Sequence, residues 1–258
     1  MIIEKSYLYE ALTGNGNCYV VDQMESTMDP FKEMKLGDIE LSEWDVIVAR
    51  LQTKGKGRTG RKWLSEKDQT LCFSMALPTS YAALALKINI ISGYAICDVI
   101  KEFVGDRAKV KWPNDVLVDK RKLSGILFHN NSGNLCMGIG VNINQTSFPE
   151  EIKDIATSLR IVTNKNHDPI EILDKILKSF IYKLKLLLSE ELKIEEKYPE
   201  YSQYYNQKTK VHLKDGSSYK IIDKGIDEDG LLIAQKEDGT EEHLVSGIDV
   251  GINLYPKK

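Results

Sequence analysis

The sequence predicts an α+β fold in which helices cover a mixed or antiparallel sheet and a small β-barrel follows at the C-terminal end. Three observations lead to this prediction. Short apolar segments bounded by turn residues fill much of the first 145 positions, and a helical pattern separates two groups of them. A second helical pattern comes next. The last fifty residues carry only short strand candidates separated by turns. We therefore expect two units, residues 1–205 and residues 206–258.

The expected strands are rich in apolar residues and end at residues that favour turns. Six precede the second helical pattern, over residues 18–23, 45–51, 70–77, 109–118, 124–129 and 135–142. Four follow it, over residues 208–213, 218–222, 231–235 and 241–245. Apolar residues recur at helical spacing over residues 82–104, where Gly105 ends the pattern, and again over residues 170–197.

The composition is that of an ordinary globular protein. Of the 258 residues, 42% are hydrophobic and 28% are charged, which excludes a collagen-like chain, a wholly disordered chain and a disulfide-stapled miniprotein. The formal net charge of −3 disfavours a generic nucleic-acid binder, because such proteins carry a basic excess. No run approaches the ~18 apolar residues that cross a bilayer, and the first residues lack a signal-peptide pattern. We expect a soluble protein that binds neither DNA nor a membrane.

The four cysteines lie far apart inside apolar segments, at Cys18, Cys72, Cys97 and Cys136. Their spacing matches neither a zinc motif nor a CxxC redox motif. Free cysteine is among the most buried residue types, so we expect buried, reduced thiols. A reducing compartment, the cytoplasm, follows from this expectation.

The most informative segment is the glycine-rich loop over residues 54–63, with the sequence KGKGRTGRKW. A run of cations is often no more than a solvated surface. Solvation, however, needs no glycine at every second or third position, whereas close approach of backbone amides to an anion does. Gly55, Gly57 and Gly60 therefore favour an anion-binding loop whose arginines can grip a phosphate or a carboxylate.

Two familiar phosphate-binding patterns fit this loop poorly. The three glycines satisfy GxGxxG, but a dinucleotide site needs a helix directly afterwards, and residues 63–77 hold no helical pattern. A P-loop needs Lys-Ser or Lys-Thr after its last glycine, where this chain has Arg61-Lys62. The sequence disfavours both interpretations.

A second segment with polar groups lies around Pro113, which interrupts the strand pattern over residues 109–118. Asn114 and Asp115 follow it and turn polar side chains to one place. An edge strand with a proline bulge is the alternative. A basic turn then leads to Lys122, which by itself has the pattern of an exposed turn residue.

The third segment is Gly138-Ile139-Gly140-Val141-Asn142-Ile143-Asn144. Glycines inside a strand weaken it unless a ligand or another backbone comes close, and Asn142 and Asn144 share one face. Both asparagines could hydrogen-bond a nucleobase, a ribose or a phosphate. A β-bulge is the alternative.

Five segments, in order over residues 20–145, resemble motifs of the biotin protein ligases. They are Glu25-Ser26-Thr27-Met28, the run from Gly55 to Trp63, Lys111-Trp112-Pro113-Asn114-Asp115, the run from Arg121 to Leu127, and the run from Gly138 to Asn142. Each motif alone is weak, but five in the family's order are specific. The C-terminal strands are similar in kind to the family's SH3-like domain. The resemblance implies a class II synthetase-like catalytic domain followed by a small SH3-like β-barrel.

The resemblance implies a biotin–[acetyl-CoA-carboxylase] ligase with ATP and biotin as substrates and with Mg²⁺. Biotin's carboxylate attacks the α-phosphate of ATP, which gives biotinyl-5′-AMP and pyrophosphate. A lysine of a biotin carboxyl carrier protein domain then attacks the adenylate and releases AMP. The basic loop suits this chemistry, because cations screen the repulsion between carboxylate and triphosphate. The Mg²⁺ ligands are left unassigned.

The resemblance also assigns site residues by motif. Lys122 and Arg58 are expected to be catalytic, acting on the carboxylate and the α-phosphate. Ser26, Thr27 and Gln52 are expected at the biotin head group. The full substrate-binding set comprises Ser26, Thr27, Met28, Gln52, Gly55, Lys56, Gly57, Arg58, Trp63, Lys111, Asn114, Asp115, Lys122, Gly125 and Asn142.

Within this set, Trp63 is expected beside the adenine and Asn142 at the nucleotide. Three features depart from the family pattern. Lys56 stands where many relatives have arginine, which keeps the charge but loses the bidentate fork. Residues 246–254 contain no arginine, which puts a catalytic contribution of the C-terminal module in doubt. Only 25 residues precede Ser26, too few for a winged helix-turn-helix, so we expect a ligase without DNA-binding function.

Two other functions stay open. Lipoate or octanoate ligases and transferases share the fold and the adenylate logic, and a non-catalytic module could use the basic loop merely to hold biotin or a nucleotide. The sequence also leaves open whether the chain forms a homodimer. A sheet edge near residues 138–144 could pair with a second copy or receive the carrier domain.

Overall fold

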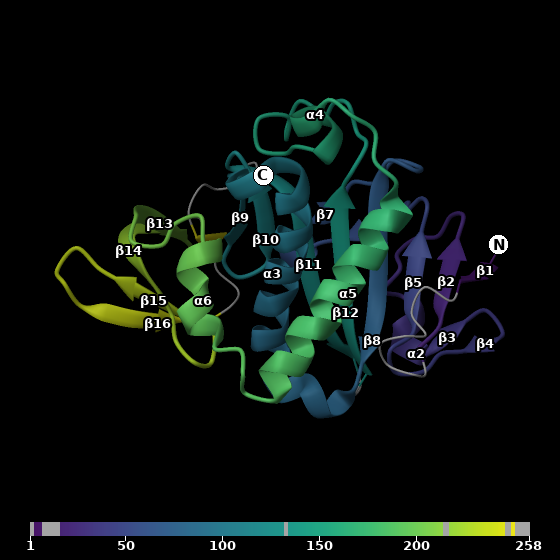
Figure 1. Cartoon of the computed structure of the whole chain (residues 1–258), viewed down its shortest axis with the longest axis horizontal. Coiled ribbons are helices and arrows are strands. Elements are labelled where there is room, and N and C mark those ends of the chain that lie inside the picture. The colour runs from purple at the N-terminus through teal and green to yellow at the C-terminus, as the bar shows by residue number, and fades with distance from the viewer. Residues whose placement is uncertain (1–2, 7–15, 132–133, 214–216, 246–248, 251–258) are drawn as a thin grey trace.

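The computed structural model describes residues 3–6, 16–131, 134–213, 217–245 and 249–250. They form an eight-stranded sheet covered by helices and a separate five-stranded antiparallel sheet (Figure 1). The predicted α+β class is confirmed. The division into units at residue 205 stays a prediction, although no helix or strand spans that position.

The large sheet has the strand order β1-β2-β5-β8-β12-β11-β10-β9. In that order its strands are β1 (Ile3–Ser6), β2 (Cys18–Val21), β5 (Val46–Ala49), β8 (Thr70–Leu77), β12 (Asn134–Asn142), β11 (Arg121–Asn131), β10 (Asp115–Val118) and β9 (Ala108–Lys111). All neighbours are antiparallel except β2 and β5, which run parallel. The sheet is therefore mixed, one of the two forms that the sequence predicts.

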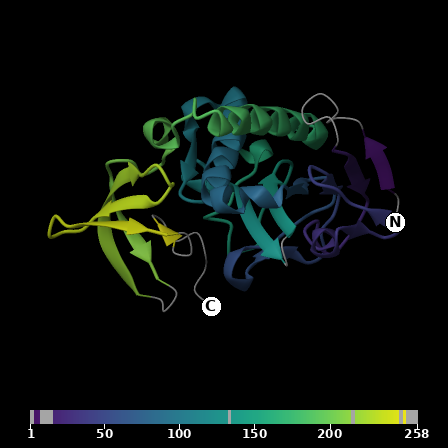
Figure 2. The same cartoon turned by 90° about the horizontal axis from the view of Figure 1, so that it is seen from below.

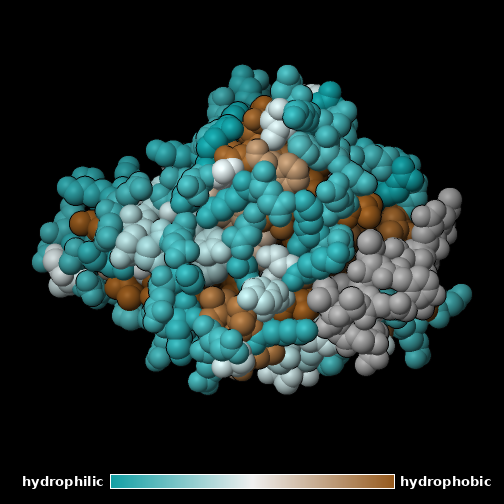
Figure 3. All heavy atoms as spheres, in the orientation of Figure 1, coloured by the Kyte–Doolittle hydropathy of each residue, from teal (hydrophilic) through white to brown (hydrophobic). Residues whose placement is uncertain are grey.

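Helices α3 (Ala85–Val104) and α5 (Pro169–Leu188) pack against each other and cover one face of this sheet (Figures 1 and 2). Successive strand residues point to opposite faces, and burial follows this rule. Val46 and Val48 of β5 join the core under the helices, whereas Ile47 joins a second core on the other face. The molecular surface seen from the helix side is mostly hydrophilic, as expected for the outward stripe of an amphipathic α5 (Figure 3).

By length and mean hydropathy (1.6), the helical stretch Thr79–Arg107 is apolar enough to cross a membrane. However, 67% of its most apolar window is buried inside the fold. Tyr94, Ala95 and Ile96 in the middle of α3 are fully buried. Its apolar composition is thus that of a core helix enclosed by the sheet and α5.

Strand β12 has two different faces. Met137, Ile139 and Val141 pack in the core under the helices, while Gly138 and Gly140 alternate with them and face the other way. Because glycine has no side chain, the sheet is hollow at this point. β12 pairs with β11 on one side and β8 on the other. The expectation of a free sheet edge at residues 138–144 is therefore wrong.

Short elements cover the rest of the second face. They are α2 (Pro30–Glu33), β3 (Lys35–Leu36) and β4 (Ile39–Glu40), and Phe31 of α2 is the centre of their core, with an exposed fraction of 1%. The remaining short elements are a hairpin of β6 (Gly55–Lys56) and β7 (Lys62–Trp63), the helix α4 (Leu159–Thr163) and three 3-10 turns at Arg58–Gly60, Thr79–Leu84 and Gly105–Arg107.

The second sheet has the order β16-β15-β14-β13-β17. Its strands are β13 (Lys208–His212), β14 (Ser218–Ile226), β15 (Leu232–Gln235), β16 (Glu241–Leu244) and β17 (Asp249–Val250). This small antiparallel sheet is compatible with an SH3-like domain. Among the residues that the structure describes, no pairing of β16 with β17 closes it into the expected barrel.

Two expected elements divide in the structure. Residues 109–118 form two strands, β9 and β10, which pair as a hairpin with Lys111 opposite Asp115 and with Pro113 in the turn. A proline lacks the N–H that a continuous strand would need there. Residues 170–197 form α5 and a separate helix, α6 (Ile194–Tyr201), because the chain turns at Glu190, whose φ is +60°. The four cysteines are buried and free, as predicted.

Candidate active site

A cavity of about 530 Å³ lies where the glycines of β12 leave the sheet hollow. Twelve of the fifteen predicted site residues line it: Ser26, Thr27, Met28, Gln52, Lys56, Gly57, Arg58, Trp63, Asn114, Lys122, Gly125 and Asn142. The other three, Gly55, Lys111 and Asp115, are buried and do not line it. Residues far apart in the sequence thus meet at one cavity.

The glycine-rich loop forms a small hairpin over this cavity. β6 and β7 pair, and the 3-10 turn Arg58–Gly60 connects them. A Cβ at Gly55 would lie 2.4 Å from the carbonyl oxygen of Trp63, so only glycine allows this pairing. Gly60 sits at φ +75°, which favours glycine. β8 follows the hairpin and no helix does, which agrees with the rejection of the dinucleotide and P-loop patterns.

Ion pairs connect the loop to the segment that carries Ser26 and Thr27. The Nζ atom of Lys54 lies 2.6 Å from Glu25 Oε1, and Lys56 pairs with Asp29. Lys32 also contacts Asp29, at 2.7 Å. These positive neighbours hold the pKa of Asp29 below its ordinary value, although burial acts in the opposite direction. Ion pairs therefore connect the glycine-rich loop with the segment of residues 25–29.

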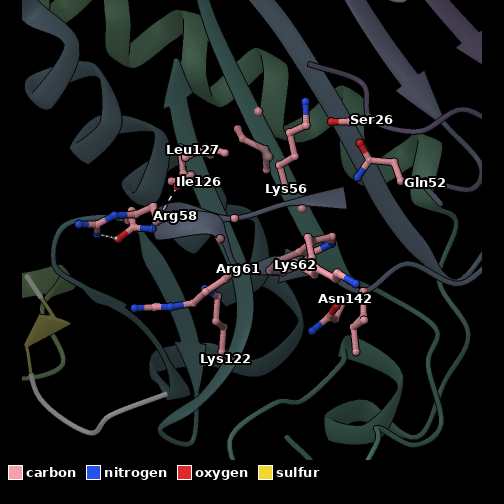
Figure 4. A pocket seen from close by; sticks show the side chains of 18 of the residues that line it. Ser26, Gln52, Lys56, Arg58, Arg61, Lys62, Lys122, Ile126, Leu127 and Asn142 are labelled. Atoms are coloured by element: carbon pink, nitrogen blue, oxygen red, sulfur yellow. Dashed lines mark hydrogen bonds between the residues drawn. The ribbon is translucent and has the colours of Figure 1, made fainter. Parts of the chain in front are cut away.

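One end of the cavity is lined mainly by uncharged polar side chains, and the charge of Lys56, which lies beside them in Figure 4, is paired with Asp29. The backbone N–H and the hydroxyl of Thr27 donate to Oε1 of Gln52, at 2.7 and 3.0 Å. The Thr27 hydroxyl also lies 2.6 Å from the hydroxyl of Ser74. The side chains of Gln52 and Ser26 line this end of the cavity (Figure 4). Donors and acceptors without charge suit a neutral polar ligand group.

The other end is cationic. Figure 4 shows Arg58, Arg61 and Lys122 gathered there, away from Ser26 and Gln52. Arg58 donates to Oδ1 of Asn114, whose own amide donates to the carbonyl of Ile126. This cluster presents several N–H donors and positive charges to whatever occupies that end.

Lys122 is paired with a buried carboxylate. Its Nζ atom lies 2.5 Å from Asp115 Oδ1, and Asp115 is 3% exposed. Burial raises the pKa of Asp115, but the positive charges of Lys122 and Lys111 outweigh it and the pKa lies below its ordinary value. The carboxylate is therefore ionised at neutral pH. Lys122 is not the exposed turn residue that its local sequence indicates, because the tip of that hairpin is Asp119–Lys120.

The indole of Trp63 lies close to Gly140 of β12 and Gly125 of β11. A Cβ at Gly140 would lie 2.2 Å from its Cε2 atom, and a Cβ at Gly125 would lie 3.2 Å from its Cζ3 atom. Lys122 Nζ lies 5.6 Å from the ring centre, within reach of a cation–π contact. The indole Nε1 is buried and makes no hydrogen bond. The absence of side chains at these two glycines thus leaves the space that the aromatic ring occupies.

The two asparagines after β12 have different surroundings. Asn142 lines the cavity, donates to the carbonyl of Thr157 and accepts from Gln145. Asn144 instead exchanges hydrogen bonds with the backbone of His167, outside the cavity. The sequence suggests that both asparagines could bind a ligand. Asn142 lies where it could do so, whereas Asn144 does not.

Sequence reasoning missed several residues that line the cavity: Gly60, Arg61, Lys62, Leu64, Ser74, Ile126, Leu127, Gly138, Ile139, Gly140, Phe148, Ile152, Ile155 and Ala156. Arg61 and Lys62 belong to the basic loop, and the two glycines of β12 carry a visible signal of close approach. Phe148 and Ile152 carry none, since the segment after residue 145 has no periodic pattern.

The site residues do not form a magnesium site. Mg²⁺ prefers carboxylate oxygens, but no Asp or Glu lines the cavity. Asp115 lies behind the wall, with one oxygen on Lys122. In the described part of the chain, no three His, Cys, Asp or Glu residues gather in a way that could hold a metal ion.

Comparison with known proteins agrees with this geometry. Residues 20–145 match the biotin/lipoate A/B protein ligase family. A solved structure of the biotin protein ligase from Aquifex aeolicus, in complex with biotin and ATP, has 31% sequence identity and a TM-score of 0.79. The match covers 90% of this chain and 97% of that one. The chain belongs to the biotin protein ligase family.

Two curated relatives extend the similarity to other bacteria. The bifunctional ligase/repressor BirA of Bacillus subtilis is 28% identical over 240 residues, which is 89% of this chain and 73% of that protein. The biotin–[acetyl-CoA-carboxylase] ligase of Mycobacterium tuberculosis is 26% identical over 72% of this chain and 71% of that protein. The mixed sheet of this chain and its SH3-like second sheet agree with its membership in the family.

Proposed function

We propose that the chain activates biotin with ATP to biotinyl-5′-AMP and transfers biotin to a lysine of a biotin carboxyl carrier protein domain. One arrangement supports this most. The cavity joins an end lined by neutral polar side chains, where Lys56 is paired with Asp29, to an end with three cations, Arg58, Arg61 and Lys122 (Figure 4). A ureido head group fits the first end, and a carboxylate next to a phosphate fits the second. The Aquifex relative solved with biotin and ATP supports the same assignment.

In the first step, an oxygen of the biotin carboxylate forms a bond to the α-phosphorus of ATP, and pyrophosphate leaves. Both reactants are anions, so the barrier depends on positive charge placed where they meet. Lys122 supplies a charge held in place by Asp115. Arg58 supplies a second charge, positioned by Asn114. Both side chains are thus oriented before the substrates arrive, which reduces the cost of reorganisation.

In the second step, the neutral amine of the acceptor lysine attacks the carbonyl carbon of the adenylate. The C–O bond to AMP breaks, an amide forms, and the proton of the attacking nitrogen passes to solvent. The same cations stabilise the leaving phosphate. The hairpin β6–β7 covers the adenylate between the steps, and its ion pairs to Glu25 and Asp29 hold it closed. Excluding water protects the anhydride from hydrolysis.

We also propose that the chain has two domains, with residues 1–205 as the catalytic unit and residues 206–258 as the SH3-like module. We place the protein in the cytoplasm, which the four buried, free cysteines support. The carrier protein domain approaches the cationic end, where the carbonyl of the adenylate lies.

The decisive experiment measures pyrophosphate and AMP release with biotin, ATP and Mg²⁺, with and without a carrier domain. We expect biotin-dependent pyrophosphate release, then carrier-dependent AMP release and one biotinylated lysine. Turnover with lipoate or octanoate but not with biotin would assign the chain to the neighbouring lipoate group instead. Tight biotin binding without any product would leave a binding module.

A further inference from the structure

The turn between β14 and β15 lies directly against helix α3. Gly230 in this turn has φ +85°, and a Cβ there would lie 2.6 Å from Cδ1 of Ile90. Lys87, one turn earlier on α3, reaches Asp229 with its Nζ atom 3.4 Å from Oδ1. Asp227 stabilises the turn by accepting from the backbone N–H groups of residues 229 and 231. The turn is therefore rigid and closely fitted.

A buried tryptophan connects this turn to the large sheet. The indole Nε1 of Trp112 donates to the carbonyl oxygen of Gly230 at 3.0 Å, and Trp112 is only 3% exposed. Trp112 lies in the turn of the β9–β10 hairpin. On the same side of that turn, Asn89 of α3 donates to the carbonyl of Pro113 at 2.6 Å. Residues 112 and 113 are thus held from α3 and from the second sheet.

The next two residues of the chain position two cations that line the cavity. Asn114 orients Arg58, and Asp115 orients Lys122. Only one residue separates Trp112 from Asn114, so a shift of the indole moves the backbone that carries the amide. By contrast, Thr27, Gln52 and Ser74 at the neutral polar end bond to one another and lie on other segments.

We propose that Gly230 and Trp112 are positioning residues, through which the second sheet sets the cationic end of the active site. This rests on the function proposed above. The second sheet then contributes to adenylation although none of its described residues lines the cavity. Its effect is confined to the end where the carboxylate and the α-phosphate meet.

The first test is Trp112→Phe, which keeps the aromatic bulk and removes the N–H donor. Because small misplacements of charged groups are costly, we expect kcat/KM for ATP in biotin-dependent pyrophosphate release to fall about tenfold. The Kd for biotin, measured by calorimetry without ATP, should stay within about twofold of wild type, since the head-group contacts are elsewhere. A general loss of structure would weaken both quantities together.

The second test is Gly230→Ala, which leaves the indole in place but displaces its acceptor. We expect the same kinetic split, and the double variant should lose no more than the worse single variant, because both break one hydrogen bond. Gly239→Ala is the matched control. Gly239 also has a positive φ (+87°) in the second sheet, but a Cβ there meets nothing within 4 Å.

The positioning role and the proposed function fail in different ways. Unchanged adenylation in Trp112→Phe and Gly230→Ala would overturn the positioning role, as would an equal loss in Gly239→Ala. Should Trp112→Phe give no folded protein, the adenylation rate of Gly230→Ala compared with that of Gly239→Ala tests the positioning role. A wild-type chain that releases no pyrophosphate with biotin would overturn the proposed function instead.

Discussion

The Nζ atom of Lys122 lies 2.5 Å from Oδ1 of Asp115, and the positive charge of the buried Lys111 also acts on this carboxylate. Two cations therefore share one carboxylate. The two positive charges exceed the one negative charge, and Lys122, which lines the cavity, presents the excess positive charge there. The site therefore attracts anions, while the buried carboxylate of Asp115 is neutralised by its two lysine neighbours.

Replacing Lys122 tests this arrangement. Lys122→Ala should lower the rate of biotin-dependent pyrophosphate release by about 100-fold, because it removes a charge aimed at the reacting anions. The fold should persist, since Lys111 still neutralises Asp115. Thermal denaturation checks the fold, and Lys120→Ala at the exposed tip of the same hairpin is the control. Equal rates in the two alanine variants would refute the assignment of Lys122.

The glycines of β12 make a size-based prediction. Gly140→Ala should raise the KM for ATP, because the new Cβ would lie 2.2 Å from the Trp63 ring and displace it. Gly93→Ala in α3 is the control, because its Cβ would meet Val110 at an ordinary 3.5 Å. Steady-state pyrophosphate release at varied ATP gives the values. An unaltered KM in Gly140→Ala would mean that Trp63 takes no part in nucleotide binding.

The neutral polar end can be probed at one hydroxyl. Thr27→Val keeps the shape but removes the group that links Gln52 and Ser74. We expect the Kd for biotin to rise about tenfold and the free energy of unfolding to fall by about 1–2 kcal/mol, since Ser74 loses a buried partner. Calorimetry and urea denaturation measure these effects. Thr53→Val is the control, at an exposed position of the neighbouring segment; a biotin Kd unaffected by Thr27→Val would contradict the assignment.

Asp223 predicts a pH dependence of stability. It is 1% exposed, and burial raises its pKa to about 6, although Tyr198, Ser202 and the N–H of Gly225 donate to it. The folded chain therefore binds this proton more tightly than the unfolded chain. Stability from this group is fully present below pH 4 and is lost as pH rises to about 6, by roughly 3 kcal/mol.

The check is to measure the free energy of unfolding by urea at several pH values between 4 and 8. Asp115 is present in both proteins, and because its pKa is lowered, its contribution changes below about pH 5 and equally in the two curves. Asp223→Asn should lack the decline between pH 4 and 6 that the wild type shows. Parallel curves for the two proteins would contradict the prediction.

Much of the fold could be predicted from periodicity alone. The strand at residues 70–77 and the end of α3 at Val104 agree to the residue with the structure. Periodicity did not divide two elements that a turn separates in the structure, at Pro113 and at Glu190. It also gave no sign of α2 or of the small β3–β4 hairpin, which are too short for a repeating pattern.

Site residues could be predicted from the sequence where neighbouring residues along the chain already indicate their role. In the glycine-rich loop, the glycines and the cations that bind an anion are neighbours in the sequence. Lys122 does not, because its significance depends on Asp115, which only the pairing of β10 with β11 brings close. Phe148 and Ile152 line the cavity through a segment without regular structure, whose path depends on tertiary contacts.

All four cysteines are buried, and burial raises the pKa of each thiol to about 12. The thiolate is the form that attacks alkylating reagents, so the cysteines of the folded chain react with them very little. The protein is thus ready for site-directed labelling without prior removal of its own cysteines. A single Thr59→Cys at the exposed tip of the glycine-rich hairpin would carry a fluorophore and report whether the loop moves when substrates bind.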